Sequence, residues 1–334
     1  MEINGEQVNG NKTYAELGLS EAIMRAIEKK GYVQATPVQA GAIPYFMEWK
    51  DVIAKAPTGT GKTFAFGIPM VEHIDPECAD VQGLVLAPTR ELAVQIQEEL
   101  RDLCEFKEGV RTVCLYGGAP IDRQINTLKK KPQIVVATPG RLMDHMKRRT
   151  VRLDKVQTVV LDEADRMLDM GFIHDVRRIL GWLPAQKQTL FFSATMPPEV
   201  QGLVDSLLHN PAKVAVNPIS SPVEVIDQKL YYVDRGNKTR LLAALIRELD
   251  VKNALVFTRT KHGANKVAGD LVKAGISAAA IHGNKSQTAR QQALADFKGG
   301  AVQVLVATDI AARGLDIEEL SHVFNYNLPD VPET

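Results

Sequence analysis

Short apolar runs alternate with amphipathic stretches along most of the chain. The first strand-like runs are Leu84–Ala87, Thr112–Tyr116, Ile134–Ala137, Val159–Leu161 and Leu190–Phe192. Helical stretches separate most of them, at Glu91–Leu103, Ile121–Lys130, Arg141–Lys147 and Ile173–Leu183. Near-continuous apolar strands that alternate with helices are typical of a parallel sheet covered on both faces. Because ligands of such sheets lie at the carboxyl ends of the strands, the residues that follow each strand deserve the closest inspection.

The pattern breaks at Asn217–Pro222, where two prolines and two serines indicate a linker. A second series follows, with strand-like runs at Lys229–Val233, Ala254–Phe257, Ala278–Ile281, Val304–Val306 and His322–Phe324. Its helical stretches are Thr239–Leu249, Gly263–Lys273 and Ala289–Phe297. We therefore predict an α/β protein with two tandem domains, at 13–216 and 227–334, each a parallel sheet with helices on both faces. The expected linker is 217–226, and 1–12 is expected to be a flexible N-terminus.

Composition adds limits to this picture. A length of 334 residues suits two domains, and 45% apolar and 24% charged residues are ordinary for a soluble protein. Lys+Arg and Asp+Glu both number 40, so the net charge neither supports nor excludes a nucleic-acid partner. The cysteines, Cys78, Cys104 and Cys114, lack metal-ligand spacing and indicate a reducing compartment. No apolar run approaches the roughly 18 residues of a membrane span, and the polar N-terminus is no signal peptide. A cytoplasmic location without a membrane partner is the default expectation.

The stretch Ala56–Thr63 follows the apolar run Asp51–Ala54 and opens a helical pattern. A strand, a Gly-rich turn and a helix N-terminus together make an anion-binding site, because backbone N–H groups and the helix dipole both face the anion. Here the turn consists of Thr58, Gly59, Thr60 and Gly61. Lys62 can neutralise outer phosphates and the Thr63 hydroxyl can hold Mg²⁺. The alternative is an ordinary Gly-containing turn, since Ala56 stands where the strict pattern has Gly.

Acidic and hydroxyl side chains follow two other strands. Asp162-Glu163-Ala164-Asp165 comes directly after Val159–Leu161. Asp162 is placed like the strand-end carboxylate that helps hold Mg²⁺ beside a phosphate-binding loop, and Glu163 can orient water for attack. The alternative is a solvated helix N-terminus with acidic first-turn residues. Ser193 and Thr195 follow the last strand of this series and could bond to the acidic cluster, although a turn with an N-cap explains them equally.

Further polar groups at strand ends suit the phosphates of a nucleic-acid strand. They are Arg90 in Pro88–Leu92, the pair Gly117-Gly118, and Thr138 and Arg141. Each alone could be a loop, but three on one sheet suggest a track. Gln39, just upstream of the Gly-rich turn, can donate to and accept from one adenine edge. In the second series Thr258–Thr260, His282–Asn284 and Thr308–Asp316 follow strands. There His282 is expected to be structural, and Arg313 and Asp316 are candidates for a ligand or an interface.

The order of these motifs resembles the DEAD-box RNA helicases of superfamily 2, from Tyr14 to the C-terminus. The matching segments are Gly31–Gln39 for the Q motif, Ala56–Thr63 for motif I, Pro88–Leu92 for Ia, Thr138–Arg141 for Ib, Asp162–Asp165 for the tetrad that names the family, Ser193–Thr195 for III, Leu255–Thr260 for IV and Val306–Asp316 for V. Ala35 stands where many members have Pro. The stretch Met167–Asp175 is similar to the bacterial RhlE type.

This resemblance implies two RecA-like domains, with ATP and Mg²⁺ as ligands of the first and RNA lying across both. Tyr14 would stack on adenine, with Tyr32 and Gln39 beside it, and Asp316 would reach the ribose. Lys62, Asp162, Glu163, Asp165, Ser193 and Thr195 would form the catalytic set. Arg90, Gly118, Thr138, Arg141, Gly283 and Thr308 would lie along the RNA backbone, which is recognised by its shape and 2′-OH groups. The implied function is ATP-driven local unwinding of single-stranded or short duplex RNA by a monomer, with ribosome-assembly or RNA-decay proteins as partners.

One departure concerns the end of the chain. In the family, motif VI (His-Arg-Ile-Gly-Arg-Thr-Gly-Arg) follows the stretch that here ends in Asn325–Thr334, and it supplies the arginine fingers. Such a finger is worth roughly 10³ to 10⁵ in rate in comparable enzymes. We therefore expect a truncated second domain that binds ATP but turns it over slowly. An ATP-gated RNA clamp is the alternative function. A phosphate-binding-loop enzyme acting on DNA or a small substrate is a third, which the Q motif and the acidic tetrad disfavour.

Overall fold

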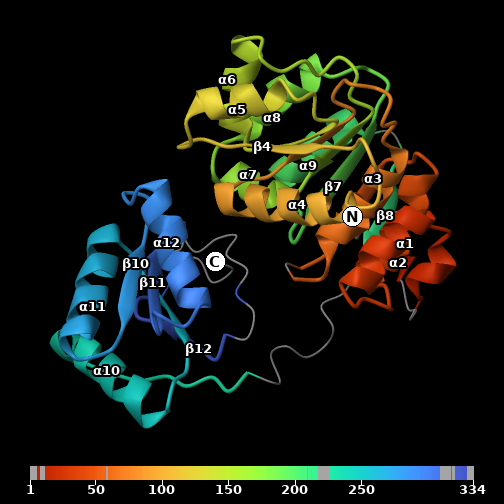
Figure 1. Ribbon diagram of the computed structural model, residues 1–334. Helices are drawn as coiled ribbons and strands as arrows, with labels where there is room; N and C mark the ends of the chain where they lie inside the picture. The colour runs from red at the N-terminus through yellow and green to blue at the C-terminus, as the bar shows by residue number, and fades with distance from the viewer. Residues whose placement is uncertain are drawn as a thin grey trace. The chain divides into compact units, whose positions relative to one another are not determined.

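The computed structural model describes residues 6–7, 12–57, 59–208, 210–216, 226–308, 317 and 320–328. The chain divides into two compact units, Met1–Ile226 and Asp227–Thr334, and each has its own sheet (Figure 1).

Unit 1 is built on a parallel sheet of eight strands in the order β1-β8-β2-β7-β6-β3-β5-β4. The strands are β1 (Glu6–Gln7), β2 (Val52–Lys55), β3 (Gly83–Leu86), β4 (Thr112–Leu115), β5 (Ile134–Ala137), β6 (Thr158–Leu161), β7 (Gln188–Ser193) and β8 (Ala212–Ala215). All strands run the same way, so their carboxyl ends share one edge. The central position of β2, β7, β6 and β3 brings together the strand ends that precede the Gly-rich turn, the hydroxyl motif and the acidic tetrad.

Helices cover both faces of this sheet. They are α1 (Glu21–Lys29), α2 (Pro37–Met47), α3 (Lys62–His73), α4 (Arg90–Leu103), α5 (Ile121–Leu128), α6 (Pro139–Lys147), α7 (Ala164–Asp169), α8 (Ile173–Trp182) and α9 (Pro198–Leu207), with a 3-10 turn at Tyr14–Leu17. Side chains alternate along each strand, so Val85 packs into the core under α1 to α4 while Leu84 and Leu86 pack into the core under α6 to α9. Burial on both faces explains the continuous apolar runs of these strands.

Local sequence signals mark the starts of several helices. Ser20 caps α1 by accepting from the Ile23 N–H, and Thr89 caps α4 by accepting from the Leu92 N–H at 3.2 Å. Pro37 and Pro139 stand in the first turns of α2 and α6, where a missing N–H costs nothing. Thr89 and Pro139 therefore fix the turns that follow β3 and β5, at the carboxyl edge of the sheet.

Some elements of unit 1 differ from the sequence-based expectation. Glu6–Gln7, inside the expected flexible N-terminus, form β1 and pair with β8 through Glu6↔Val214 and Gln7↔Ala215. The strand pattern was not predicted because two residues show no periodicity; the edge of β8 supplies their partners. Helices α7 and α9 and strand β8 were likewise not predicted. The expected linker lies almost wholly outside the described residues.

Unit 2 has a parallel sheet of four strands in the order β10-β11-β9-β12. Its elements are α10 (Lys238–Glu248), β9 (Ala254–Thr258), α11 (Lys261–Lys273), β10 (Ala278–Ile281), α12 (Gln287–Lys298), β11 (Val304–Thr308) and β12 (His322–Asn325), with a 3-10 turn at Arg235–Asn237. The strand expected at Lys229–Val233 is wrong: residues 227–234 have no regular secondary structure, and Tyr232 is 93% exposed. A strand needs a neighbour, and this segment pairs with no described strand.

Among the helices of the described residues, none combines the length and the apolar character that crossing a bilayer requires.

Candidate active site

The turn between β2 and α3 has the geometry of an anion cradle. Gly59 and Gly61 have φ values of 80° and 84°, in the left-handed region that favours glycine. Gly61 is the N-cap of α3, and the Thr60 hydroxyl donates to the Pro57 carbonyl at 2.8 Å. Lys62 and Thr63 begin the helix, so the N-terminal N–H groups of α3 and the Lys62 ammonium belong to one site. Thr58 lies outside the described residues.

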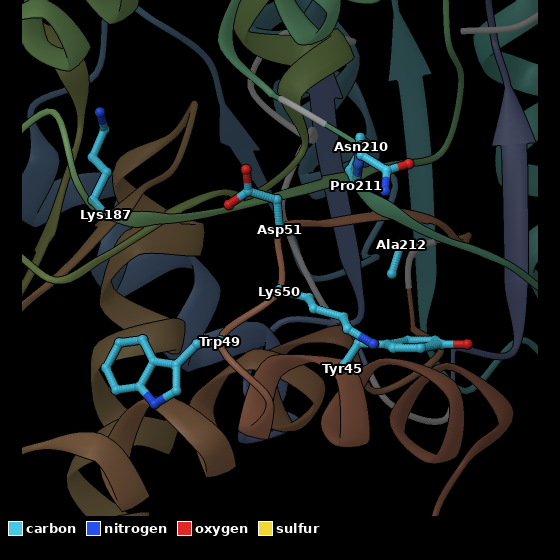
Figure 2. A pocket seen from close by; sticks show the side chains of 8 residues that line it. All are labelled: Tyr45, Trp49, Lys50, Asp51, Lys187, Asn210, Pro211 and Ala212. Carbon is cyan, nitrogen blue, oxygen red and sulfur yellow. The ribbon is translucent and has the colours of Figure 1, made fainter.

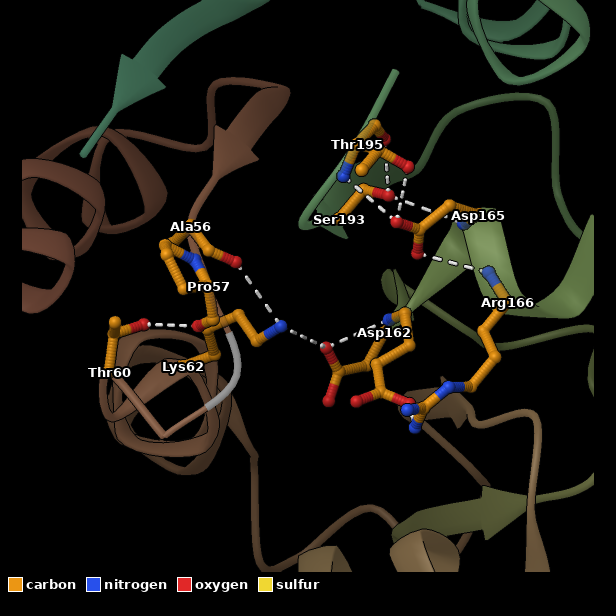
Figure 3. A network of polar contacts seen from close by, with 10 residues as sticks. Ala56, Pro57, Thr60, Lys62, Asp162, Asp165, Arg166, Ser193 and Thr195 are labelled. Carbon is orange, nitrogen blue, oxygen red and sulfur yellow. Dashed lines mark hydrogen bonds and ion pairs between the residues drawn. The ribbon is translucent and has the colours of Figure 1, made fainter. Parts of the chain in front are cut away.

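Lys62 and Asp162 meet in the interior at this edge. Their side chains are 6% and 3% exposed, and 4.0 Å separates Lys62 Nζ from Asp162 Oδ1. Lys62 Nζ also donates to the Ala56 carbonyl at 3.4 Å (Figure 3). Both contacts are long for a buried ammonium, so the ammonium retains capacity for closer acceptors such as phosphate oxygens.

Burial sets the ionisation of Asp162. It raises the pKa of this carboxyl to about 6; the Lys62 ammonium lowers the pKa, and the neighbouring carboxylates of Glu163 and Asp165 raise it further. A bound divalent cation would lower the pKa of Asp162 instead, because it supplies positive charge where two carboxylates already face one ammonium. The donor set therefore fits Mg²⁺.

This raised pKa predicts how the stability of the ligand-free protein depends on pH. The native state keeps the Asp162 proton up to about pH 6, whereas the unfolded chain loses it near 3.8, so the native state binds more protons between these values. The free energy of unfolding should therefore fall as the pH rises through this window. Relative to Asp162→Asn, which cannot ionise, wild type should lose about 2 kcal/mol between pH 4 and 7.

Urea denaturation of both proteins across that range measures the difference. Asp165→Asn is the matched control, because the pH dependence there should have the opposite sign. Hydrogen bonds hold the pKa of Asp165 below its usual value, so the stability of wild type relative to Asp165→Asn should fall as the pH falls. A constant difference between wild type and Asp162→Asn at every pH would contradict the prediction.

Glu163 is held in an unusual backbone conformation. Its φ is 51°, it is the N-cap of α7, and its side chain is 6% exposed. Its backbone N–H donates to Asp162 Oδ1 at 3.0 Å, and its carboxylate forms an ion pair with Arg166 one turn further along α7. A non-glycine residue in the left-handed region carries strain, which is characteristic of functional positions. Arg166 was not singled out from the sequence, where it is one more charge on a short helix.

Asp165 joins the hydroxyl motif to the acidic tetrad. Its Oδ2 accepts from both the backbone N–H and the hydroxyl of Thr195, at 2.8 and 2.7 Å. Its own backbone N–H donates to Ser193 Oγ at 3.2 Å, and Ser193 Oγ donates to the Thr195 carbonyl at 2.7 Å (Figure 3). The hydrogen bonds that the sequence suggested between these motifs are thus present. Burial alone would raise the pKa of Asp165, but the bonds from Thr195 and Ser193 lower it overall.

The same network reaches the Gly-rich turn. The Ala56 N–H donates to the Ser193 carbonyl at 3.0 Å, which continues the pairing of β2 with β7. A shift of Ser193 would therefore be felt both at Ala56 and at Asp165. Three segments far apart in the sequence form one polar cluster.

Gln39 and Tyr14 lie against the Gly-rich turn, in an arrangement that differs from the expected one. Gln39 Oε1 accepts from the Tyr14 hydroxyl at 2.6 Å and from the Thr36 N–H at 2.8 Å, and Gln39 Nε2 donates to the Gly61 carbonyl at 3.0 Å. Both acceptor sites of the amide oxygen are thus occupied, which leaves one amide hydrogen for a ligand. Gln39 can donate to adenine in this conformation, but it cannot also accept from it.

Tyr14 is buried where stacking on adenine was expected. It is 2% exposed, and burial raises the pKa of its phenol to about 12, so the hydroxyl remains a donor to Gln39. The ring packs in the core under α1 to α4. Tyr32 is the accessible aromatic residue of this region: it is 51% exposed and lies edge-on to Phe64, with ring centroids 5.6 Å apart.

Arg90, Gly118 and Arg141 converge on the turn after β4. Gly118 has a φ of 89°, and a Cβ built on it would overlap the Arg90 guanidinium, with only 2.9 Å to Cζ. From the other side, an Arg141 guanidinium N–H donates to the Ala119 carbonyl at 3.0 Å. Thr138 is the N-cap of α6, one turn before Arg141. The structure thus brings the predicted nucleic-acid residues of unit 1 to one place.

A buried chain of hydrogen bonds, called the relay below, supports this turn. The sequence analysis did not predict it. Gln124 donates to the Tyr116 carbonyl at 2.9 Å, and its Oε1 lies 3.0 Å from His145 Nε2. His145 is fully buried, and burial together with Arg141 lowers its pKa, so the ring stays neutral. Because the amide oxygen can only accept, Nε2 carries the proton, and Nδ1 faces the Thr150 hydroxyl at 2.8 Å. Neither residue stood in a motif, so no local signal pointed to the relay.

In unit 2 the candidate residues also lie at the carboxyl edge of the sheet. Thr308 ends β11 and is in register with Thr258, the last residue of β9. Gly283 is exposed and follows β10. His282 is 3% exposed and its Nε2 lies 3.0 Å from Asn265 Oδ1, as expected of a structural residue. Asp316 and Arg313 lie outside the described residues.

Comparisons with known proteins identify the class to which this fold and site belong. A model of the DEAD/DEAH box helicase family matches residues 36–203, and a model of the helicase conserved C-terminal domain matches residues 237–334. The chain therefore belongs to the DEAD-box RNA helicases of superfamily 2, and its two units are RecA-like domains.

Among its relatives are helicases named CshA. The DEAD-box ATP-dependent RNA helicase CshA of Geobacillus kaustophilus is 48% identical over 322 residues, which are 96% of this chain and 69% of that protein. CshA of Bacillus subtilis is 47% identical over 322 residues, which are 96% of this chain and 65% of that protein. The chain thus spans about two thirds of the length of these relatives. The expected RhlE-type subtype stays a prediction.

Solved structures of the family are also similar. Saccharomyces cerevisiae Dbp5 bound to RNA and ADP BeF3 matches with a TM-score of 0.86 and 30% identity over 96% of this chain and 82% of that chain. A DEAD box protein from Methanococcus jannaschii matches with a TM-score of 0.59 and 37% identity, over 96% of this chain and 86% of that chain.

Proposed function

We propose that this chain is an ATP-dependent RNA helicase that binds ATP with Mg²⁺ in unit 1, contacts the RNA backbone with residues of both units, and opens short duplexes locally. The names of the CshA relatives and the RNA and ADP BeF3 bound to Dbp5 support this proposal. A cytoplasmic monomer that works with ribosome-assembly or RNA-decay proteins remains the accompanying prediction.

The observation that carries the proposal is the buried group of Lys62, Asp162 and Glu163 beside the turn at Gly59 and Gly61. Burying one ammonium and two carboxylates is costly unless a ligand completes their charge and hydrogen bonding. Such a site suits the β- and γ-phosphates of a nucleoside triphosphate with its cation. The left-handed turn provides N–H groups without a Cβ in the way.

Each residue has a role in this proposal. Lys62 binds the β/γ-phosphates, and Thr63 and Asp162 hold Mg²⁺, which when bound neutralises charge that develops on the phosphates. Glu163 accepts the proton of the attacking water, and its ion pair with Arg166 orients it. The cluster of Asp165, Ser193 and Thr195 transmits changes at the phosphates along β7.

Tyr32 and Gln39 form the adenine side of the proposed site. The remaining Gln39 amide hydrogen donates to the base, while the Tyr14 hydroxyl fixes the amide orientation through its bond to Oε1. Gln39 also bonds to the Gly61 carbonyl, so base recognition is linked to the phosphate-binding turn.

The proposed RNA contacts are backbone contacts. Arg90, Gly118, Thr138 and Arg141 offer guanidinium groups, a hydroxyl and an uncovered backbone N–H at one edge of unit 1, and Gly283 and Thr308 offer smaller groups at the corresponding edge of unit 2. Such groups bind phosphates and 2′-OH groups with little base readout. Affinity for single-stranded RNA should therefore depend weakly on sequence and strongly on salt.

ATP hydrolysis by the full chain, measured with and without single-stranded RNA and alongside strand displacement on a short duplex, tests the proposal. RNA should stimulate hydrolysis, and ATP should accelerate displacement. Equal stimulation by DNA would point to a different nucleic-acid substrate. ATP-dependent RNA retention without displacement would identify a clamp instead of a helicase.

The contact between Arg90 and Gly118 provides a local test of the RNA surface. In Gly118→Ala the added methyl group displaces the Arg90 guanidinium and strains the turn. RNA affinity should fall about three- to tenfold while ATP affinity stays unchanged, as measured by fluorescence anisotropy with labelled RNA and nucleotide. Gly171→Ala is the matched control, since Gly171 also has a positive φ but a Cβ there would meet nothing within 4 Å. Equal losses in both variants would mean that strain alone is responsible.

A further inference from the structure

Two hollows in unit 1 lie away from the candidate active site. The larger, about 560 Å³, is lined by Tyr45, Trp49, Lys50, Asp51, Lys187, Asn210, Pro211 and Ala212 (Figure 2). Its charged groups already have partners within the chain. Lys50 pairs with Glu48 and lies over the Tyr45 ring, Asp51 accepts from the Thr189 N–H, and Lys187 donates to a carbonyl. This hollow therefore offers a ligand few charged groups that are not already engaged within the chain.

The second hollow, about 390 Å³, lies between the C-terminal ends of α6 and α8. We call it the α6–α8 hollow; it is lined by Met146, Arg149, Val151, Arg152, Leu153, Asp154 and Trp182. Helix α6 runs back from the carboxyl end of β5, and residues 151–157 lead into the start of β6. The hollow therefore lies at the amino ends of the strands, at the opposite edge of the sheet from Lys62 and Arg90.

The buried residues that line the α6–α8 hollow are apolar, and a largely exposed tryptophan lies beside them. Met146, Val151 and Leu153 are 6%, 8% and 5% exposed, whereas Trp182 is 58% exposed. No aromatic or cation–ring contact of Trp182 occurs within the described part of the chain. An exposed tryptophan beside an apolar hollow is the usual anchor of a protein–protein contact.

The rim is basic. Residues 144–155 contain five Lys or Arg and two Asp. Both aspartates are already paired: Asp144 with Arg148 at 3.0 Å, and Asp154 with Arg152 at 3.0 Å. Arg149 has no side-chain ion pair or hydrogen bond with the residues that the structure describes, and its side chain is exposed. It is thus an exposed cation beside the apolar hollow.

Arg149 also occupies a position that disfavours it. Its φ is 55°, directly after the C-cap Arg148 of α6. Its N–H donates to the Met146 carbonyl at 3.0 Å and the Thr150 N–H donates to the His145 carbonyl at 3.0 Å, which is the Schellman pattern of helix ends. Glycine is the usual residue there because it adopts the left-handed region without strain. An arginine at this position is therefore less favourable than glycine for the backbone.

We propose that the α6–α8 hollow binds an acidic segment of a partner protein. An apolar side chain of that segment packs against Met146, Val151 and Leu153 beside Trp182, and its carboxylates pair with Arg149 and Arg152. Charge complementarity selects this occupant, because the rim carries an excess of cations while the floor excludes charge. RNA fits less well, because the floor is aliphatic and one aromatic ring provides no stacking series.

Fluorescence anisotropy with the full chain and a labelled peptide tests the proposal. The peptide carries one Phe or Leu flanked on both sides by Asp and Glu, and a version with Ser in place of that residue is compared. The first peptide should bind saturably, and the Ser version at least about fivefold more weakly.

Arg149→Gly is the most informative variant. It removes the cation and relieves the left-handed strain, so its melting temperature should equal or exceed that of wild type while peptide affinity falls at least about fivefold. Trp182→Ala should also weaken binding. Arg148→Ala is the matched control: Arg148 is the neighbouring arginine, is paired with Asp144 and is not among the lining residues, so its affinity should stay within about twofold.

Three results would overturn the proposal: no saturable binding of the acidic peptide, binding that Arg149→Gly and Trp182→Ala leave unchanged, or a loss confined to single-stranded RNA affinity. The last result would assign the surface to RNA. Because ATP and RNA residues lie at the other edge, failure here leaves the proposed helicase function intact.

Discussion

Replacing Glu163 with Gln should lower ATP turnover by at least about a hundredfold while ATP affinity changes by less than about twofold. The amide has the shape of the carboxylate but cannot accept a proton from the attacking water. Single-turnover hydrolysis and equilibrium binding of a labelled nucleotide measure the two quantities separately.

The surroundings of Glu163 make this substitution specific. Its side chain is 6% exposed and paired with Arg166, so Gln can occupy the same space and retain a hydrogen bond to the guanidinium. Asp169→Asn, on the same short helix but outside the acidic tetrad, serves as the control and should leave turnover within about twofold. Undiminished turnover in Glu163→Gln would disprove the role of Glu163 as the base.

Replacing Lys62 with Ala should weaken ATP binding by at least about a hundredfold. The ammonium lies 4.0 Å from Asp162 Oδ1 in the interior, and its removal leaves that carboxylate facing Glu163 and the incoming phosphates without compensation. Loss of the phosphate contact and added repulsion act in the same direction, so the effect on binding exceeds that of a surface lysine.

Isothermal titration with ATP and Mg²⁺ measures this loss. Lys55→Ala is the matched control, because Lys55 is an exposed lysine at the end of β2, a few residues before the turn. Circular dichroism should show both variants folded. If Lys62→Ala bound ATP about as tightly as wild type does, Ala56–Thr63 would not be the phosphate site. The proposed function would then lose its basis.

Local patterns were sufficient for most elements of the fold. The runs at Leu84–Leu86 and Ile134–Ala137 predicted buried parallel strands, because continuous apolar character is what burial on both faces requires. The amphipathic stretches at Glu91–Leu103 and Gly263–Lys273 predicted helices for the same local reason. Lys229–Val233 shows the limit: an apolar run indicates a strand only if another strand is available to pair with it.

Some features of the candidate site could likewise be predicted from the sequence, and others could not. The positions of the Gly-rich turn, the acidic tetrad and the strand-end arginines at the carboxyl edge of the sheet could be predicted, since residue type and spacing along the chain indicate them. The hydrogen bonds of Gln39 could not be predicted, because its amide oxygen accepts from Tyr14, which is 25 positions away in the sequence. Arg166 and the relay through Gln124 and His145 could not either, because their importance depends only on what they contact.

By itself, the sequence determined that a Gly-rich turn joins a strand to a helix, which predicts an anion site, and that acidic residues follow another strand. Both are short-range properties of backbone and residue type. Only the tertiary structure decided that Asp162 is buried beside Lys62, that Asp165 is bound by Thr195, and that Gly118 makes room for Arg90. Those outcomes depend on strand order and packing, which bring distant residues into one low-dielectric environment where their charges and hydrogen bonds act on one another.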